Sequence, residues 1–249
     1  MTFKGESGHA SMPFGKDNSI EKMSEAIIRI NKYKMSYTTK YLKHLAKGLG
    51  VDFFQRMLIT RKMFLSLALK ILSKTAPSMA APIHSMSRTT FATTIVRGGQ
   101  KINVLPGSSR VDIDCRLLPG QDFNYAEKHI KKALGKKLVK EVEITILEDS
   151  LVNIGSASPL NTEFVDAIKR TFQKLIPNSS VVPVIAYGAT DLRYIRRNGG
   201  NGYGFSLVEP NTPGAEITEM AHNVNERVRI KSVELTVKAM YELAKEYLS

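Results

Sequence analysis

The chain has 249 residues, 43% of them hydrophobic, which is enough for one large domain or two modest ones with a substantial core. Its single cysteine, Cys115, excludes an intramolecular disulfide, a zinc site built from cysteines and a CxxC redox site, so we expect a reducing compartment, the cytoplasm. The sequence has neither an apolar run of the ~20 residues that a membrane span needs nor the pattern of a signal peptide, so we expect neither export nor a spanning helix.

The net charge of +13 is concentrated in one segment. Residues 36–75 hold eight Lys or Arg against the single acid Asp52, which gives +7 of the +13. Such a charge suits an anionic partner: nucleic acid, a phospholipid surface or an acidic metabolite. The absence of tryptophan, of an aromatic RNA-binding strand motif and of a recognition helix argues against nucleic acid.

The first elements in chain order are a strand, a helix and an insertion. Residues 1–9 alternate as a strand does, and residues 18–33 have a polar cap followed by apolar residues at helical spacing. Residues 38–87 form an apolar and basic insertion, for which two or three amphipathic helices are the simplest account. Two glycines interrupt it and two prolines close it: Gly48, Gly50, Pro77 and Pro82.

After the insertion the apolar period changes to two. Residues 88–99 and 109–120 predict two antiparallel strands, joined by residues 100–108, and a helix at 124–134 and a strand at 141–148 follow. Without the insertion the order is β-α-β-β-α-β, the ferredoxin-like order, which predicts an α+β domain over residues 1–149.

A second domain is predicted over residues 150–249. A helix at 160–176, an apolar strand at 181–188, a glycine-rich loop and a terminal helix at 231–248 alternate as in an α/β layer. With so few strands, this segment is expected to be only part of a domain.

Four short motifs concentrate residues that can carry chemistry. Each has a structural alternative: Gly-Gly and Pro-Gly pairs occur in hairpin turns, GATD suits a helix N-cap, and a histidine near either end is commonly a solvated surface group. In chain order the motifs are GHASMP (residues 8–13), GGQKINVLPG (98–107), YGATDLR (187–193) and MAHNVNER (220–227).

Taken together, in this order and at these separations, the four motifs resemble the zinc-dependent metallopeptidase and amidohydrolase family that includes aminoacylase, acetylornithine deacetylase, succinyl-diaminopimelate desuccinylase and the glutamate carboxypeptidases. The resemblance covers the chain from Gly5 to the last helix. It implies a ferredoxin-like lid or dimerisation domain with a helical insertion, followed by the C-terminal segment of an α/β zinc-exopeptidase catalytic domain. It also implies a homodimer formed through the lid.

The resemblance implies a role for each motif. His9 matches the lid histidine that reaches into the partner subunit's active site, where its N–H donates to the oxyanion formed from an amide. Asn103, Arg116 and Thr190 match substrate-binding positions, with Asn103 and Arg116 suited to a substrate carboxylate. Asp191 is expected to order the loop that holds Thr190. His222 matches a metal-binding histidine, of the type that zinc accepts.

The family pattern is incomplete in this sequence. The family's mechanism uses two metal ions, with zinc expected and cobalt or manganese as alternatives, and ligands from an H-x-D segment and a Glu-Glu pair, neither of which occurs here. The other histidines, His44, His84 and His129, are not followed two residues later by aspartate. We therefore expect the isolated chain to bind catalytic metal weakly and to have no hydrolase activity of its own.

Two functions remain open from the sequence. The first is part of a hydrolase that cleaves N-acyl amino acids or small peptides with a free carboxylate, with the N-terminal catalytic half missing through a truncated or split gene, a cloning boundary or a misplaced start codon. The second is a non-catalytic dimerisation or interaction module. The insertion likewise has two accounts: packed helices with a solvated basic face, or a surface that lies against anionic lipid or funnels acidic substrates.

Overall fold

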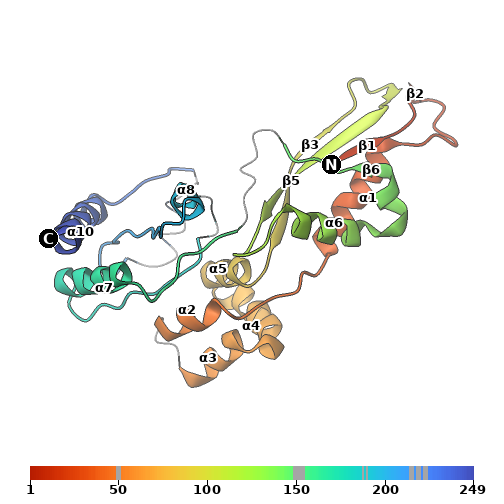
Figure 1. Ribbon diagram of the computed structural model, residues 1–249. Helices are drawn as coiled ribbons and strands as arrows, with labels where there is room; N and C mark the ends of the chain where they lie inside the picture. The colour runs from red at the N-terminus through yellow and green to blue at the C-terminus, as the bar shows by residue number, and fades with distance from the viewer. Residues whose placement is uncertain are drawn as a thin grey trace. The chain divides into compact units, whose positions relative to one another are not determined.

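The computed structural model describes residues 1–48, 52–147, 155–186, 188, 190–212, 216, 220 and 224–249 (Figure 1). These form two compact units, one of Met1–Tyr37 and Arg88–Ser156 and the other of Thr38–Ser87 and Ala157–Ser249. The predicted domain boundary at 149/150 lies outside the described residues and stays a prediction. Within the described part, no helix has the length and apolar character needed to cross a bilayer.

A four-stranded antiparallel sheet organises the first unit, with the strand order β3-β5-β1-β6. This order and the two helices that accompany the sheet confirm the predicted ferredoxin-like α+β arrangement. The elements are β1 (Thr2–Lys4), α1 (Ser19–Lys32), β3 (Thr90–Gly98), β5 (Ser108–Arg116), α6 (Phe123–Leu138), a short 3-10 helix η1 (Val139–Glu141) and β6 (Val142–Glu143).

The core of this unit lies between the sheet and the two helices. Phe3 of β1, Val111 of β5 and Leu134 of α6 are fully buried together with apolar residues of α1. The polar N-cap predicted for the first helix is present in the structure. The side chain of Asn18 accepts from the backbone N–H of Ile20 at the start of α1. Burial of three such side chains fixes which face of each strand points inward.

The expected continuous strand over residues 1–9 is wrong, because the structure divides it at Gly5. β1 ends at Lys4, and β2 (Gly8–His9) leaves the sheet to pair with β4 (Val104–Leu105) in a separate two-stranded ribbon. A β-carbon at Gly5 would lie 2.6 Å from both the Asp17 carbonyl oxygen and the Ser19 backbone nitrogen. Only glycine permits this close approach, and the redirected chain carries the first motif.

Replacing Gly5 with alanine is therefore expected to destabilise the fold by about 1–3 kcal/mol, since backbone atoms must move to admit the methyl group. The matched control is Gly8→Ala, because the nearest atom to a β-carbon there is the flexible Cε of Lys16 at 3.8 Å. Urea unfolding of both variants measures the difference. Equal midpoints for the two variants would contradict this account of the turn.

The insertion contains four helices in the described residues, where two or three were expected. Its apolar interior includes Leu42, Ile59, Leu65 and Ile83. Pro77 begins the last helix instead of closing the segment, a position where the missing proline N–H is not needed, and Pro82 lies inside that helix. The helices are α2 (Leu42–Gly48), α3 (Phe53–Thr60), α4 (Lys62–Thr75) and α5 (Pro77–Ser87).

The described part of the C-terminal segment consists of helices joined by loops. The predicted helices at 160–176 and 231–248 are confirmed as α7 (Glu163–Leu175) and α10 (Ile230–Leu248), with the short α8 (Leu192–Arg197) between them. The predicted strand at 181–188 is wrong, since its described residues join no ladder. A strand needs a hydrogen-bonding neighbour, and the described part of this segment supplies none.

Candidate functional site

The ribbon of β2 and β4 brings two of the predicted site residues together. His9 lies opposite Val104 in the antiparallel register, and the backbone N–H of Ala10 donates to the carbonyl oxygen of Asn103 at 3.0 Å. His9 and Asn103 are both exposed. Two motifs that are more than 90 positions apart in the sequence therefore share one surface.

Ser11 sets the tautomer of the His9 ring. The backbone N–H of Ser11 donates to His9 Nδ1 at 3.2 Å, and the Ser11 hydroxyl lies 2.7 Å from the same nitrogen. Since a backbone N–H can only donate, Nδ1 is the acceptor in this hydrogen bond, and the ring proton lies on Nε2. The exposed ring thus presents an N–H donor, which an oxyanion site needs.

Backbone bonds hold the loop around His9. The N–H of Gly5 donates to the carbonyl of Gly107 at 2.9 Å, the N–H of Glu6 donates to that of Asp17 at 2.7 Å, and the N–H of Met12 donates to that of His9 at 3.0 Å. These contacts tie the motif to the sheet and to the start of α1, so the donor has a defined direction.

Arg116 is the last residue of β5, whereas Asn103 lies before the first residue of that strand, Ser108. Eight residue steps separate Ser108 from Arg116, a distance of ~27 Å along an extended strand. Its guanidinium already binds Asp114, with Nε 2.6 Å and the terminal nitrogen 2.9 Å from the two carboxylate oxygens. Within one copy of the chain, the structure does not bring Arg116 to His9 and Asn103.

Thr190 precedes α8 and has an unsatisfied hydroxyl. Its carbonyl oxygen accepts from the N–H of Arg193 at 3.2 Å, while its buried Oγ1 has no hydrogen-bond partner among the described residues. Asp191 occupies the N-cap position, but its side chain makes no capping bond. A buried hydroxyl usually has a hydrogen-bond partner, which for Thr190 would come from outside the described residues.

The described residues do not build a metal centre. No three His, Cys, Asp or Glu side chains in the described part of the chain lie close enough to hold an ion, and His222 is outside it. His129 has a structural environment, since Nδ1 lies 2.8 Å from the Tyr33 hydroxyl and its ring contacts Tyr125. Burial, with help from Lys132 and Lys128, lowers the pKa of His129. A two-metal site does not fit these residues alone.

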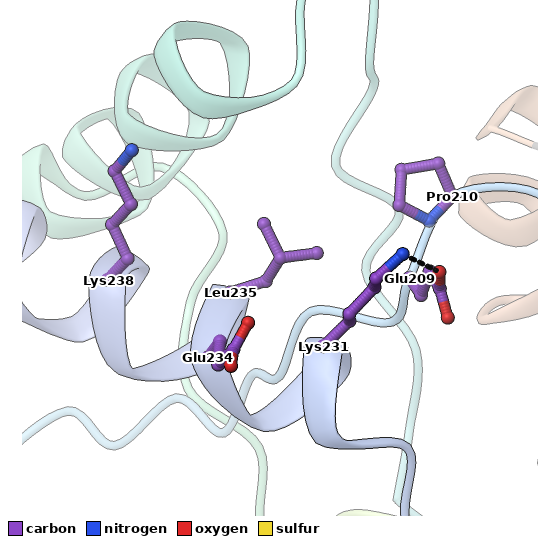
Figure 2. Close-up of a pocket in the computed structure, with 6 residues that line it drawn as sticks. All are labelled: Glu209, Pro210, Lys231, Glu234, Leu235 and Lys238. Carbon is purple, nitrogen blue, oxygen red and sulfur yellow. Dashed lines mark ion pairs between the residues drawn. The ribbon is translucent and has the colours of Figure 1, made fainter.

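A hollow of about 460 Å³ runs along α10 and contains none of the predicted site residues (Figure 2). Figure 2 shows Lys231 of α10 directed at the Glu209 carboxylate, an ion pair of 3.5 Å, and Arg229 pairs with the same carboxylate at 3.1 Å. The Ser232 hydroxyl accepts from the N–H of Glu209. These contacts attach the preceding loop to the helix, and we assign the hollow a structural role.

Sequence reasoning missed one residue of this site, Ser11. The available signal was its position two residues after His9, which allows its backbone N–H to turn back to the ring.

A family model described as a peptidase dimerisation domain matches residues 1–142 of the chain. The chain is 28% identical over 242 residues to the N-fatty-acyl-amino acid synthase/hydrolase PM20D1.1 of Danio rerio, covering 95% of the chain and 44% of that protein. It is 24% identical over 242 residues to a probable carboxypeptidase S-like 2 of Dictyostelium discoideum, covering 96% and 44%. The chain spans about half the length of these curated relatives.

Solved structures share the fold at low sequence identity. An M20 family metallo-carboxypeptidase, Sso-CP2 of Sulfolobus solfataricus, superposes with a TM-score of 0.62 at 13% identity, over 99% of this chain and 60% of that one. Human carnosine dipeptidase 1 gives a TM-score of 0.56 at 13% identity, over 98% and 55%. These likenesses concern the fold.

Proposed function

The chain belongs to the family of the M20 peptidase dimerisation domain, and from this premise we propose that it is the lid and closing segment of a metal-dependent amide hydrolase. The substrates are N-acyl amino acids or small peptides with a free carboxylate. The names of the relatives support this class, because they include a fatty-acyl-amino acid hydrolase, a carboxypeptidase and a desuccinylase.

The observation that carries the proposal is the hydrogen bonding of His9. Attack of water on an amide carbonyl places negative charge on the carbonyl oxygen, and a preorganised N–H donor stabilises that charge. His9 donates this hydrogen bond from Nε2 into the active site of the partner subunit, while Asn103 on the same ribbon contacts the substrate. Arg116, supplied by one subunit of the dimer, and Thr190 provide the remaining substrate contacts.

The metal ions of this hydrolase, zinc or alternatively cobalt or manganese, are held mainly by residues outside this chain. Those residues are the H-x-D segment and the Glu-Glu pair that the sequence lacks, with His222 as the ligand from this chain. When bound, the metals supply an activated water. One face of α10 exposes four apolar or aromatic side chains, those of Val233, Val237, Met240 and Tyr241. An exposed face of this kind supports the presence of a further polypeptide segment that packs against the helix.

A homodimer formed through the edge strand β3 brings His9 to the partner's site. β3 is nine residues long, has no proline or lysine, and exposes 44% of Ile95 and 57% of Val96. An edge of this kind is a template for pairing with another strand.

The cytoplasm is the compartment we assign to this protein. Its free cysteine, Cys115, suits a reducing environment of this kind.

Metal-dependent hydrolysis of a panel of N-acyl amino acids tests the proposal. We expect turnover by the intact protein, with its N-terminal half present, to be lost with chelator and restored by zinc. We expect the purified 249-residue chain to give no turnover. Chelator-sensitive hydrolysis by that chain alone would contradict the assignment of the metal site to residues outside it.

The alternative function is a non-catalytic dimerisation module of the same family, favoured by the lack of a ligand cluster among the described residues. Dimerisation without metal-dependent turnover, even after addition of a polypeptide carrying the missing ligands, would favour this alternative.

A further inference from the structure

One face of α4 exposes apolar and basic side chains together. Met63, Leu67 and Ile71, spaced four residues apart, are 79%, 53% and 48% exposed. Lys70 and Lys74 fall on the same side of the helix and are also exposed. We refer to these five residues as the α4 stripe. The opposite side of α4 buries Leu65 and Ala68, so the helix already has a core.

A basic hollow of about 440 Å³ lies in the same group of helices. No carboxylate among the described residues forms an ion pair with Lys43, Arg56 or Arg61. The hollow places these cations beside the Thr39 hydroxyl, and such cationic and hydroxyl donors suit a phosphate. The Thr60 hydroxyl donates to the Arg56 carbonyl oxygen at 2.7 Å. It is lined by Thr39, Lys43, Arg56, Thr60, Arg61 and Lys62.

The charge around the α4 stripe favours an anionic occupant. Residues 53–111 contain no Asp or Glu, and the preceding Asp52 is used as the N-cap of α3, where it accepts from Gln55 N–H at 2.8 Å. A second copy of this chain would bring equal charges together and is disfavoured. A phospholipid surface offers both an anionic outer layer and an apolar interior.

We propose that the insertion docks on anionic phospholipid bilayers through the α4 stripe and the basic hollow. The apolar members of the stripe enter the boundary between headgroups and acyl chains, as in interfacial amphipathic helices, and the hollow receives a lipid phosphate. The stripe and the hollow contain none of the residues assigned to the hydrolase site, so the inference is independent of the proposed hydrolase activity.

Flotation with lipid vesicles tests the docking. The intact protein should bind vesicles of phosphatidylcholine and phosphatidylserine more tightly than vesicles of phosphatidylcholine alone, and the difference should shrink as salt is raised. Inorganic phosphate added at constant ionic strength should weaken this binding by no more than the loss of the hollow's cations does, because the apolar contacts of the α4 stripe remain. Binding that ignores lipid charge, or that free phosphate abolishes, would overturn the proposal.

Matched variants assign the binding to these residues. The variant Arg56→Gln/Arg61→Gln removes two cations and should weaken binding to anionic vesicles about 30-fold. The variant Leu67→Gln/Ile71→Gln removes apolar contacts and should weaken binding at low and at high salt. The control, Lys136→Gln/Lys137→Gln, removes the same charge from exposed positions on α6. An equal effect of the control would show only bulk charge attraction and would overturn the assigned surface.

A labelling experiment distinguishes lipid from a protein partner. Leu67→Cys in the intact protein should react with a maleimide in solution and become protected by anionic vesicles. Cys115 gives little background, since burial raises the pKa of its thiol to about 11 and keeps it protonated at neutral pH. Protection without vesicles would show that another part of the protein or a second copy covers this face, and would overturn the proposal.

Discussion

His9→Ala in the intact, metal-loaded protein is expected to lower kcat about 10²–10³-fold, the cost of removing one preorganised oxyanion donor. KM should change little, because the hydrogen bond forms to charge that develops only in the transition state. Ser11→Ala should have a smaller effect of about two- to tenfold, since the backbone N–H of Ser11 still bonds to Nδ1. Steady-state kinetics on an N-acyl amino acid substrate give kcat and KM for both variants.

Co-expression of two inactive variants tests whether His9 acts across the dimer. A His9→Ala subunit and a His222→Ala subunit together form one complete site in each mixed dimer. Random pairing makes half of the dimers mixed, so activity should return to about one quarter of the wild-type value. No recovery in a verified mixed dimer would show that His9 acts within its own subunit.

Breaking the edge of β3 is expected to produce a monomer with an equally large loss of kcat. In Ile95→Lys/Val96→Lys, two lysines on the exposed edge oppose pairing with a second strand. The fold should survive, because both side chains are already exposed and one lysine lies opposite Asp112 in the register. His9 can no longer reach a partner's site, so kcat should fall by the same factor as in His9→Ala.

The control for this variant changes the other edge of the sheet. Ile146→Lys/Leu147→Lys adds the same charges just after β6, where both side chains are exposed. Sedimentation equilibrium and kinetics on both variants give the comparison. A dimer that persists in the β3 variant would contradict the assigned edge, and a fully active monomer would contradict the role of His9 across the dimer.

The ferredoxin-like arrangement was predictable from the sequence because its elements carry strong local signals. The alternation of Val111, Ile113 and Cys115 marks β5, and Asn18 marks the start of α1. The family motifs also identified His9 and Asn103, which the ribbon of β2 and β4 brings together.

Other features depend on contacts that no local pattern records. The end of β1 depends on how closely Asp17 and Ser19 approach Gly5. The apolar residues 181–188 have the composition of a strand, but hydrogen-bonding neighbours decide whether a strand forms. The tautomer of His9 depends on a loop that folds Ser11 back to the ring, a geometry that residue identity alone does not specify.

The intact mass of the native protein that carries this sequence, measured with anything that copurifies, tests the central claim most directly. Our account predicts either a polypeptide of about twice the 27.7 kDa of this chain or a stable partner, in each case supplying the H-x-D segment and the Glu-Glu pair. A lone chain of 27.7 kDa without such a partner would contradict the hydrolase assignment and leave the dimerisation module as its function.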